Sequence, residues 1–441
     1  MFKKCTFNAL WAALLISRVL LAQSSNTSLS TLIPTLWGPE GLRVDSEATL
    51  PNGQTHSAHF NSSFQTDISQ FNAALATQLL SLPLPSPASG FTYSFDPALG
   101  VLVRSSESFG PILAERADTI GKKKFSLGFS FQHFNYDSID GIPLNNVPAV
   151  FTHDDAIELN GRQDLVTTNN SIEIKVDQFT IFSSIGLTNR LDLSVAVPIL
   201  RTEMNVTSYD YIQRIGTTDP KTHFFANGQP GSPGYYGNFR AFSNSGSASG
   251  IGDVTVRLFG TAHRWEHAGL AIGLDVRAPS GDEKNFLGSG TVGIKPFGAY
   301  SYTYNRFSPH INLGYQWNGK SILAGNPLTG TKEHLPNQFL YTFGADVGMV
   351  RWMTLAVDLL GQRVIDAPSI FPETFTALTG GTTWPNIGFQ HNSSFNINNG
   401  AIGLKVNPGG NLLFNFNVLL KLDNGGLRDK ITPLLGVTYT F

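Results

Sequence analysis

From residue 124 to the end of the chain, hydrophobic and polar residues alternate with a period of two. In the first such stretch, Phe125, Leu127, Phe129 and Phe131 alternate with serine, glycine and glutamine. This alternation predicts β-strands with one apolar and one polar face. The pattern predicts about twelve strands, at 125–136, 172–187, 190–206, 251–262, 269–280, 291–304, 307–318, 338–349, 354–365, 395–407, 411–422 and 430–441.

Fourteen strands remain an alternative, because some segments interrupt the pattern. The alternation slips around Gln178–Phe179, which suggests a β-bulge. Proline removes a donor from a strand ladder, and four prolines lie inside predicted strands. They are Pro198, Pro296, Pro309 and Pro433.

The predicted strands are long for a globular protein. Most span about 11 to 14 residues, against about 5 to 6 for a common strand, and such strands can cross a bilayer at a tilt. A closed membrane barrel needs strands with one face for lipid and one for the lumen. We therefore predict an all-β, transmembrane antiparallel β-barrel over 124–441. A soluble β-sandwich is the alternative, but its strands would be shorter and more charged.

Short and longer connections alternate between the predicted strands. Short turns lie near 188–190, 304–306, 351–352 and 408–411, whereas long loops lie near 137–171, 207–250, 319–337 and 366–394. Outer-membrane barrels have short periplasmic turns and longer extracellular loops. The lengths of the connections therefore predict that the protein lies in the bacterial outer membrane, with the long loops outside the cell.

Composition agrees with this interpretation. The 441 residues are 41% hydrophobic but only 14% charged, and the mean hydropathy is −0.04. Soluble domains carry about 25% charged residues, and helical transporters are far more apolar. Strands with one apolar and one polar face explain both values, because the chain then has few charged residues while its mean hydropathy stays near zero. The net charge of −2 indicates no nucleic-acid partner.

The N-terminal part has a different pattern. Residues 1–22 combine Lys3 and Lys4 with an apolar stretch, which predicts a signal peptide, and Cys5 is the chain's only cysteine. Residues 23–123 are predicted to form a periplasmic or luminal segment, which either plugs the barrel or lies beneath it. Within it, apolar residues repeat at helical spacing over 65–82.

Charged residues on the predicted inner face are the candidate substrate-binding residues. Acids and bases are nearly equal in number, which favours paired charges or a filled lumen over an open ion-selective pore. We expect Asp253, Arg257, Asp275 and Arg277 to form a polar network with part of the segment before residue 124. These side chains either stabilise the lumen wall or contact substrate. The full candidate set is Asp253, Arg257, Asp275, Arg277, Lys295, Asp346, Asp358 and Lys405.

Motifs for catalysis, metal or cofactor binding are not found. Gly288–Gly293 matches a dinucleotide fingerprint in its letters, but the strand pattern continues through it, so a loop entering a strand is the better interpretation. His263 and His267 lack the further ligands that a zinc site needs. We predict no catalytic residues, no metal and no cofactor.

Aromatic residues gather near the ends of the predicted strands, as is typical of the bilayer interface. The chain ends on Phe441, with Tyr439 two positions before it. A terminal phenylalanine preceded by alternating apolar residues resembles the recognition signal of the outer-membrane assembly machinery. We therefore expect this machinery, membrane lipid and a small organic solute as partners.

Several segments resemble a known family. They are Gly90–Tyr93, Ser108–Ile112, Ala114–Gly121, Gly250–Asp253, Arg277–Glu283, Lys295–Pro296, Asn407–Leu412 and Thr432–Pro433. Together they are similar to the outer-membrane transporters named after the meta-pathway of phenol degradation, which are distantly similar to FadL-type channels. The resemblance covers about 90–441 and implies a β-barrel channel for small hydrophobic or aromatic compounds.

A channel or transporter for small, hydrophobic or aromatic organic compounds is therefore the expected function. One alternative is a structural or adhesive surface barrel that acts through the loops near 207–250 and 366–394. The other is a lipase-type outer-membrane enzyme, but no serine and histidine stand at a suitable spacing.

Overall fold

The computed structural model describes residues 28–38, 41–49, 75, 92–96, 101–104, 108–152, 164–216, 218–377 and 381–441. The predicted signal peptide at 1–22 lies outside the described residues. So does the predicted helix at 65–82, apart from Leu75.

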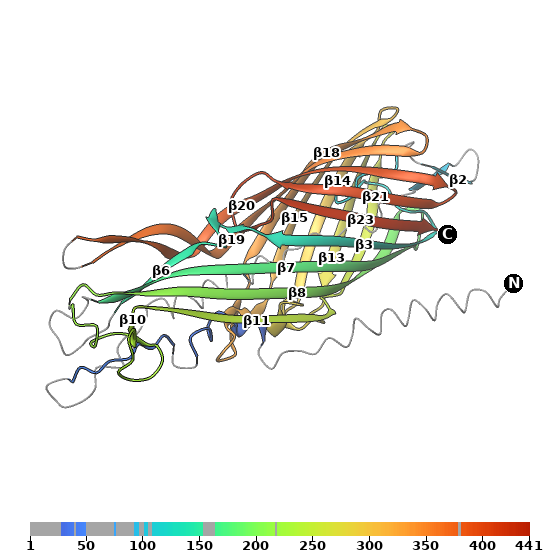
Figure 1. The fold of residues 1–441 in the computed structure, drawn as a ribbon. Coiled ribbons are helices and arrows are strands. Elements are labelled where there is room, and N and C mark those ends of the chain that lie inside the picture. The colour runs from blue at the N-terminus through green and yellow to red at the C-terminus, as the bar shows by residue number, and fades with distance from the viewer. Residues whose placement is uncertain are drawn as a thin grey trace.

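Twelve antiparallel strands form a closed barrel (Figure 1). Each strand pairs with its neighbours, and the pairing of β7 with β8 closes the ring. The predicted all-β barrel is confirmed with twelve strands rather than fourteen. The barrel strands are β3 (Phe125–Tyr136), β7 (Leu165–Gly186), β8 (Leu191–Gln213), β12 (Thr255–Arg264), β13 (Ala268–Arg277), β14 (Gly293–Tyr302), β15 (Phe307–Asn318), β18 (Asn337–Val350), β19 (Met353–Thr376), β20 (Thr383–Gly409), β21 (Leu412–Lys421) and β23 (Ile431–Thr440).

The two ends of the barrel differ in their connections. At one end, here called the turn end, β7 joins β8, β12 joins β13, β14 joins β15, β18 joins β19 and β20 joins β21 through short turns. The other end, here called the loop end, carries the longer connections. Phe441 and the start of β3 meet at the turn end, where the Phe441 amide donates to the Phe125 carbonyl at 2.7 Å. The alternation of connection lengths therefore agrees with the sequence.

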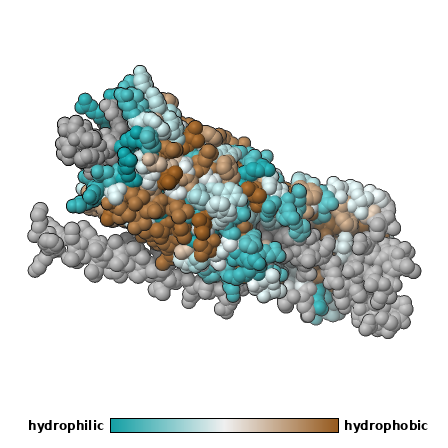
Figure 2. All heavy atoms as spheres, turned by 180° about the vertical axis from the view of Figure 1, so that it is seen from behind, coloured by the Kyte–Doolittle hydropathy of each residue, from teal (hydrophilic) through white to brown (hydrophobic). Residues whose placement is uncertain are grey.

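The outer surface carries an apolar band. The outward side chains of β12 and β13 are apolar and exposed at Val256, Leu258, Leu270, Ile272, Leu274 and Val276, and Ile272 is 63% exposed. Figure 2 shows hydrophobic atoms gathered between more polar regions. A closed barrel leaves no strand edge to be solvated, so this band can face hydrocarbon. The protein is therefore a transmembrane β-barrel of the type found in the bacterial outer membrane.

Two strands reverse their pattern part of the way along. On β7, Phe179, Ile181 and Ile185 point outward, but closer to the loop end Ile172, Ile174 and Val176 point inward. The outward positions there are Glu173, Lys175 and Asp177. β8 reverses at the same level, because Gln178 pairs with Leu200 and Asp177 with Arg201.

The predicted bulge at Gln178–Phe179 is wrong. The register of β7 against β3 and β8 runs without a shift through both residues. The alternation slips in the sequence because the strand leaves the apolar band and enters water, where the outer face must be polar. The four prolines all lie within paired strands.

The strands continue well beyond the apolar band. β8 extends to Gln213, β19 to Thr376, and β20 begins at Thr383, so most of the loop predicted at 366–394 is strand. Two further strands, β6 (Val147–Thr152) and β11 (Phe239–Ile251), add to the sheet at β7 and β8. The predicted loop at 207–250 therefore also contains strand. Its residues are rich in glycine, serine and asparagine, a composition that is also typical of loops.

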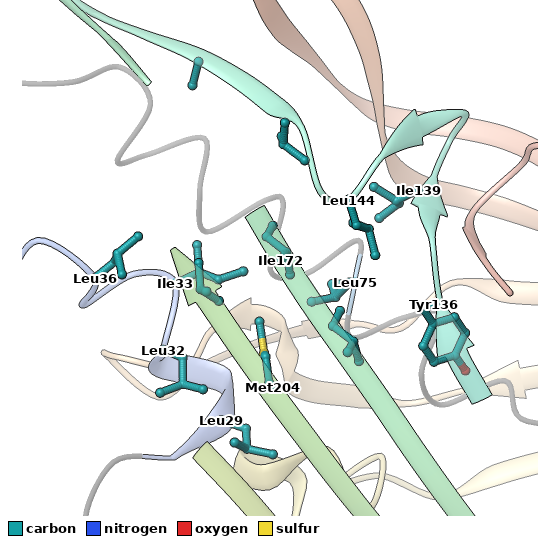
Figure 3. Packing of buried hydrophobic residues seen from close by; sticks show 14 of the residues in the cluster. Leu29, Leu32, Ile33, Leu36, Leu75, Tyr136, Ile139, Leu144, Ile172 and Met204 are labelled. Carbon is teal, nitrogen blue, oxygen red and sulfur yellow. The ribbon is translucent and has the colours of Figure 1, made fainter. Parts of the chain in front are cut away.

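Residues 28–38 and 41–49 cover the inner face of the loop end, and we call them the cap. The cap includes η1 (Leu29–Thr31), and its Leu29, Leu32 and Ile33 pack against Ile172 and Met204 (Figure 3). The Trp37 indole donates to Asp210 on β8 at 2.7 Å. The amide of Leu29 donates to Asn285 in η2 (Glu283–Asn285) at 3.0 Å.

Short strands complete the described structure. No helix among the described residues is long and apolar enough to cross a membrane. The short strands are β1 (Tyr93–Asp96), β2 (Val101–Arg104), β4 (Ser138–Ile139), β5 (Ile142–Pro143), β9 (Phe225–Ala226), β10 (Tyr236–Gly237), β16 (Lys320–Asn326), β17 (Thr331–His334) and β22 (Leu427–Arg428).

Candidate functional site

Residues 108–121 run across the lumen near the turn end, and we call them the luminal segment. Its backbone contacts inward-facing side chains on opposite sides of the wall. The Phe109 amide donates to Thr354 on β19 at 3.0 Å, and the Ile120 amide donates to Asp192 on β8 at 2.8 Å. Between them, the Glu115 amide donates to Asn312 on β15 at 2.7 Å. The inward polar side chains thus replace the ladder that this irregular backbone lacks.

The first charge cluster joins the luminal segment to β12 and β13. Arg257 forms a bidentate pair with Asp275, with Nε and Nη2 at 2.6 and 2.7 Å from the two carboxylate oxygens. The same guanidinium binds Glu115 of the luminal segment. Lys295 on β14 lies 2.8 Å from Asp275. Opposite charges on facing registers, Arg257 with Asp275 and Asp275 with Lys295, account for this cluster.

Two stacked aromatic rings lie beside this cluster. Phe297 stacks on Phe259 with ring centroids 5.8 Å apart, and its ring lies 4.8 Å from the Arg257 guanidinium. A side chain at Gly273 would collide with the Phe297 ring. The glycine therefore lets the ring lie flat against the inner wall.

The second pair, Asp253 with Arg277, has a different role. Asp253 accepts hydrogen bonds from the amides of Gly281 at 3.1 Å and Ser289 at 2.8 Å, and from the Ser289 hydroxyl. It therefore holds the loop 278–292 against the inside of the barrel. Arg277 Nε lies 3.6 Å from Asp253, and its Nη2 donates to Asn318 at 2.8 Å.

The second charge cluster lies on β15, β18, β19 and β20. Asp346 binds Arg116 and Ser108 of the luminal segment, and His310 Nε2 lies 2.6 Å from a carboxylate oxygen of Asp358. All of these side chains are buried.

Lys405 fixes the luminal segment from the same side. Its ammonium group donates to the carbonyls of Phe109 and Pro111 at 3.0 and 2.5 Å. The structure therefore separates the eight predicted residues into two groups. Asp253, Arg257, Asp275, Arg277 and Lys295 meet in one region, and Asp346, Asp358 and Lys405 in another.

A cavity of about 310 Å³ lies in the lumen and is lined by all five residues of the first group. None of the second group lines it. Its wall also has apolar side chains from the strands, from the luminal segment and from the loop 278–292. These are Leu113, Pro198, Leu200, Phe286, Leu287, Phe297, Leu313, Leu340, Leu360, Ile397 and Leu419.

Several residues of this site are not indicated by the sequence pattern alone. Glu115, Arg116 and Ser108 belong to the motifs that carried the family resemblance, but no charge role was predicted for them. His310 lies on a predicted inner face and was not selected. Among the described residues, no group of three or more His, Cys, Asp or Glu side chains could hold a metal ion.

No curated protein matched the chain. It is similar to the COG4313 outer membrane channel from Pseudomonas putida F1, with 13% identity over 73% of this chain and 96% of that chain and a TM-score of 0.43. A Pseudomonas aeruginosa FadL homologue gives 9% identity over 80% and 94%, with a TM-score of 0.30. The Ralstonia pickettii toluene transporter TbuX gives 9% identity over 73% and 90%, with a TM-score of 0.25.

A family model supports the resemblance seen in the sequence. The model covers residues 161–363. The motifs that lie outside this range are Gly90–Tyr93, Ser108–Ile112, Ala114–Gly121, Asn407–Leu412 and Thr432–Pro433. Residues 161–363 match the family described as "Putative MetA-pathway of phenol degradation", which confirms the expected resemblance.

Proposed function

We propose that this protein is an outer-membrane channel for small hydrophobic or aromatic organic compounds. The cavity of about 310 Å³ inside the lumen carries the proposal, because it offers a mainly apolar wall within a barrel that faces lipid. Ligand pockets of this kind combine hydrophobic and aromatic lining with a few placed polar groups. The volume suits a compound of about one ring.

The proposed path runs from the loop end, outside the cell, to the turn end in the periplasm. We propose that residues 23–123 act within the lumen, after removal of a signal peptide at 1–22, and that 124–441 form the barrel. The ion pairs of Arg116 and Glu115 with the wall support this role for the luminal segment. In this proposal, the segment limits the lumen to a gated passage.

We further propose that the chain acts as a channel and not as an enzyme. The assembly machinery is the proposed partner of the last strand, through Tyr439 and Phe441. Their rings lie 4.7 Å apart at the turn end, and Phe441 is 60% exposed.

Solute flux through reconstituted protein tests the function. Liposomes with the purified barrel are expected to take up small aromatic solutes faster than liposomes without it, and planar bilayers are expected to show conductance events. A folded barrel that carries no solute would refute the channel. Phospholipase activity of the same sample would instead favour the enzymatic alternative.

A further inference from the structure

We propose that Arg277 binds the carboxylate of a small amphipathic ligand, such as an aromatic carboxylate, in the luminal cavity. This inference rests on the proposed channel function and narrows its substrate class. The charges around the cavity, the few hydrogen bonds that Arg277 makes among the described residues and the adjacent apolar wall carry it.

The negative charges of the cavity are already bound. Asp275 is paired with Arg257 and Lys295, and Glu115 with Arg257. Asp253 accepts hydrogen bonds from two backbone amides and one hydroxyl of the loop 278–292, and it lies 3.6 Å from Arg277 Nε. A cationic ligand would therefore have to displace an internal partner from each carboxylate.

Arg277 differs from Arg257 in its hydrogen bonds. Arg257 donates through three nitrogens to two carboxylates. Among the described residues, Arg277 donates a hydrogen bond only through Nη2, to the neutral amide of Asn318, and its Nε lies 3.6 Å from the Asp253 carboxylate, beyond hydrogen-bond distance. A buried guanidinium gains most from a carboxylate, which it can bind through two parallel hydrogen bonds.

Glycine at position 293 lets the Arg277 guanidinium lie close to the wall. A Cβ atom at Gly293, which pairs with Arg277 across β13 and β14, would lie 3.1 Å from Nη2 and 2.6 Å from Gln316 Nε2. Because glycine stands there, both groups approach the strand closely. Gln316 and Arg277 both line the cavity.

Apolar side chains lie next to Asp253 and Arg277. A Cβ atom at Gly252 would be 3.1 Å from both Leu200 Cδ1 and the Leu287 carbonyl oxygen, so strand and loop meet there. Leu200, Leu287 and Phe286 line the same cavity as Arg277. The site therefore offers one cationic donor group and an apolar wall, which suits a ring that bears a carboxylate.

Calorimetric titration of the full-length barrel in detergent with benzoate, benzamide and acetate tests this site. Benzamide has the shape of benzoate without its charge, and acetate has the charge without the ring. We expect benzoate to bind about tenfold more tightly than either, because only benzoate uses both parts of the site.

Two variants of Arg277 and one control assign the effect. Arg277→Gln is expected to weaken benzoate binding about tenfold and leave benzamide within about twofold, and Arg277→Lys is expected to be intermediate. Arg351→Gln removes one charge from an exposed turn at the turn end and should change neither. Resistance of the folded barrel to SDS shows whether each variant is folded.

Equal binding of benzoate and benzamide would overturn the inference, as would full benzoate affinity in folded Arg277→Gln. If Arg277→Gln does not fold, the folded variants Arg277→Lys and Gly293→Ala take its place. Benzoate affinity equal to that of the wild type in both variants would then overturn the inference. Flux distinguishes this failure from failure of the channel function. If liposomes with the barrel take up neutral aromatics but the barrel does not prefer benzoate, the channel function stands and only the proposed carboxylate site is wrong.

Discussion

The inside of the barrel has two regions with opposite chemistry. Near the turn end, the luminal segment 108–121 is held by charged and polar side chains, including Arg116 with Asp346 and Glu115 with Arg257. At the loop end, the cap is held largely by apolar contacts, in which Leu32 and Met204 are fully buried. Both segments fill the same barrel, yet one is bound by ion pairs and the other by hydrophobic packing.

The difference follows from what surrounds each part of the wall. Where lipid faces the outside, apolar side chains point outward and the alternate positions that point inward are polar. Where water faces the outside, the strand has its polar side outward and can bury its apolar side within. The reversal on β7 and β8 at Gln178 and Leu200 therefore marks the outer boundary of the apolar band.

Loss of a luminal ion pair is expected to have the largest effect. Asp346→Ala leaves the buried Arg116 without its carboxylate, and breaking such a pair costs about 3 to 5 kcal/mol. Urea unfolding in lipid vesicles should show this loss, and planar bilayers should show longer openings because the luminal segment is less firmly held.

Glu266→Ala is the control, because that side chain is 88% exposed on a turn at the turn end. Unchanged stability and conductance in Asp346→Ala would show that the luminal segment does not depend on this pair.

Truncation at the loop end is expected to loosen the cap. Met204→Ala removes a fully buried side chain and should cost about 3 kcal/mol of local stability. Hydrogen exchange should become faster in residues 28–38 and 41–49, while residues 108–121 keep their protection. Leu328→Ala, at a leucine that is 56% exposed, should have no such effect. Faster exchange in both regions would show that they are not independent.

An outward charge is expected to be tolerated in one region only. Ile272→Arg places a charge in the apolar band and should lower the free energy of unfolding by about 2 kcal/mol. Ser171→Arg places the same charge outward on the loop half of β7 and should be almost neutral. Equal penalties in urea titrations of the two variants would contradict the boundary at Gln178.

The smallest effect is expected at a clasp outside the membrane. Asp164, just before β7, binds His223 at 2.7 Å and the amides of Ile215 and Gly216 at 2.8 Å each. Burial of the carboxyl acts to raise its pKa, but the hydrogen bonds from His223 and the two amides outweigh it and lower the pKa of Asp164. The clasp matters because Phe224, next to His223, forms a bridge with Asp45 of the cap.

A group with a lowered pKa stabilises the fold above its ordinary pKa and loses that contribution as the pH falls toward the lowered value. Wild-type cap protection should therefore fall below about pH 4. Asp164→Asn should lose about 1 kcal/mol at neutral pH and show a flatter profile in the acid range. Parallel profiles for both proteins, measured by hydrogen exchange, would exclude this clasp as the source.

Much of the barrel could be predicted from local sequence. Phe125–Tyr136 and Phe307–Asn318 are identical in the prediction and the structure, and β13, β14 and β21 differ by few residues. Alternation is a local property, and lipid on one side imposes it on every membrane-level strand. The inward direction of Asp253, Arg257, Asp275 and Arg277 follows from the same rule.

The extended strands were harder to predict. At Gln178 the phase of β7 changes without any irregularity in the backbone, so a period alone suggests a bulge. The residues of β11 are mostly serine, glycine and asparagine, which resemble a loop. Only the pairing with β8 identifies them as strand, because partner hydrogen bonds do not depend on the side chains.

The sequence by itself determined the class of fold, the positions of about twelve strands, the outward apolar band and the supply of inward charges, because each follows from short-range alternation. Only the tertiary structure decided which charges meet and how many hydrogen bonds each charged group makes. Arg257 and Arg277 have the same side chain and lie on neighbouring strands, and both point inward. Glu115 reaches one of them from more than a hundred residues away, and the loop 278–292 occupies the carboxylate beside the other. Such long-range contacts depend on how the chain closes, and no local pattern encodes them.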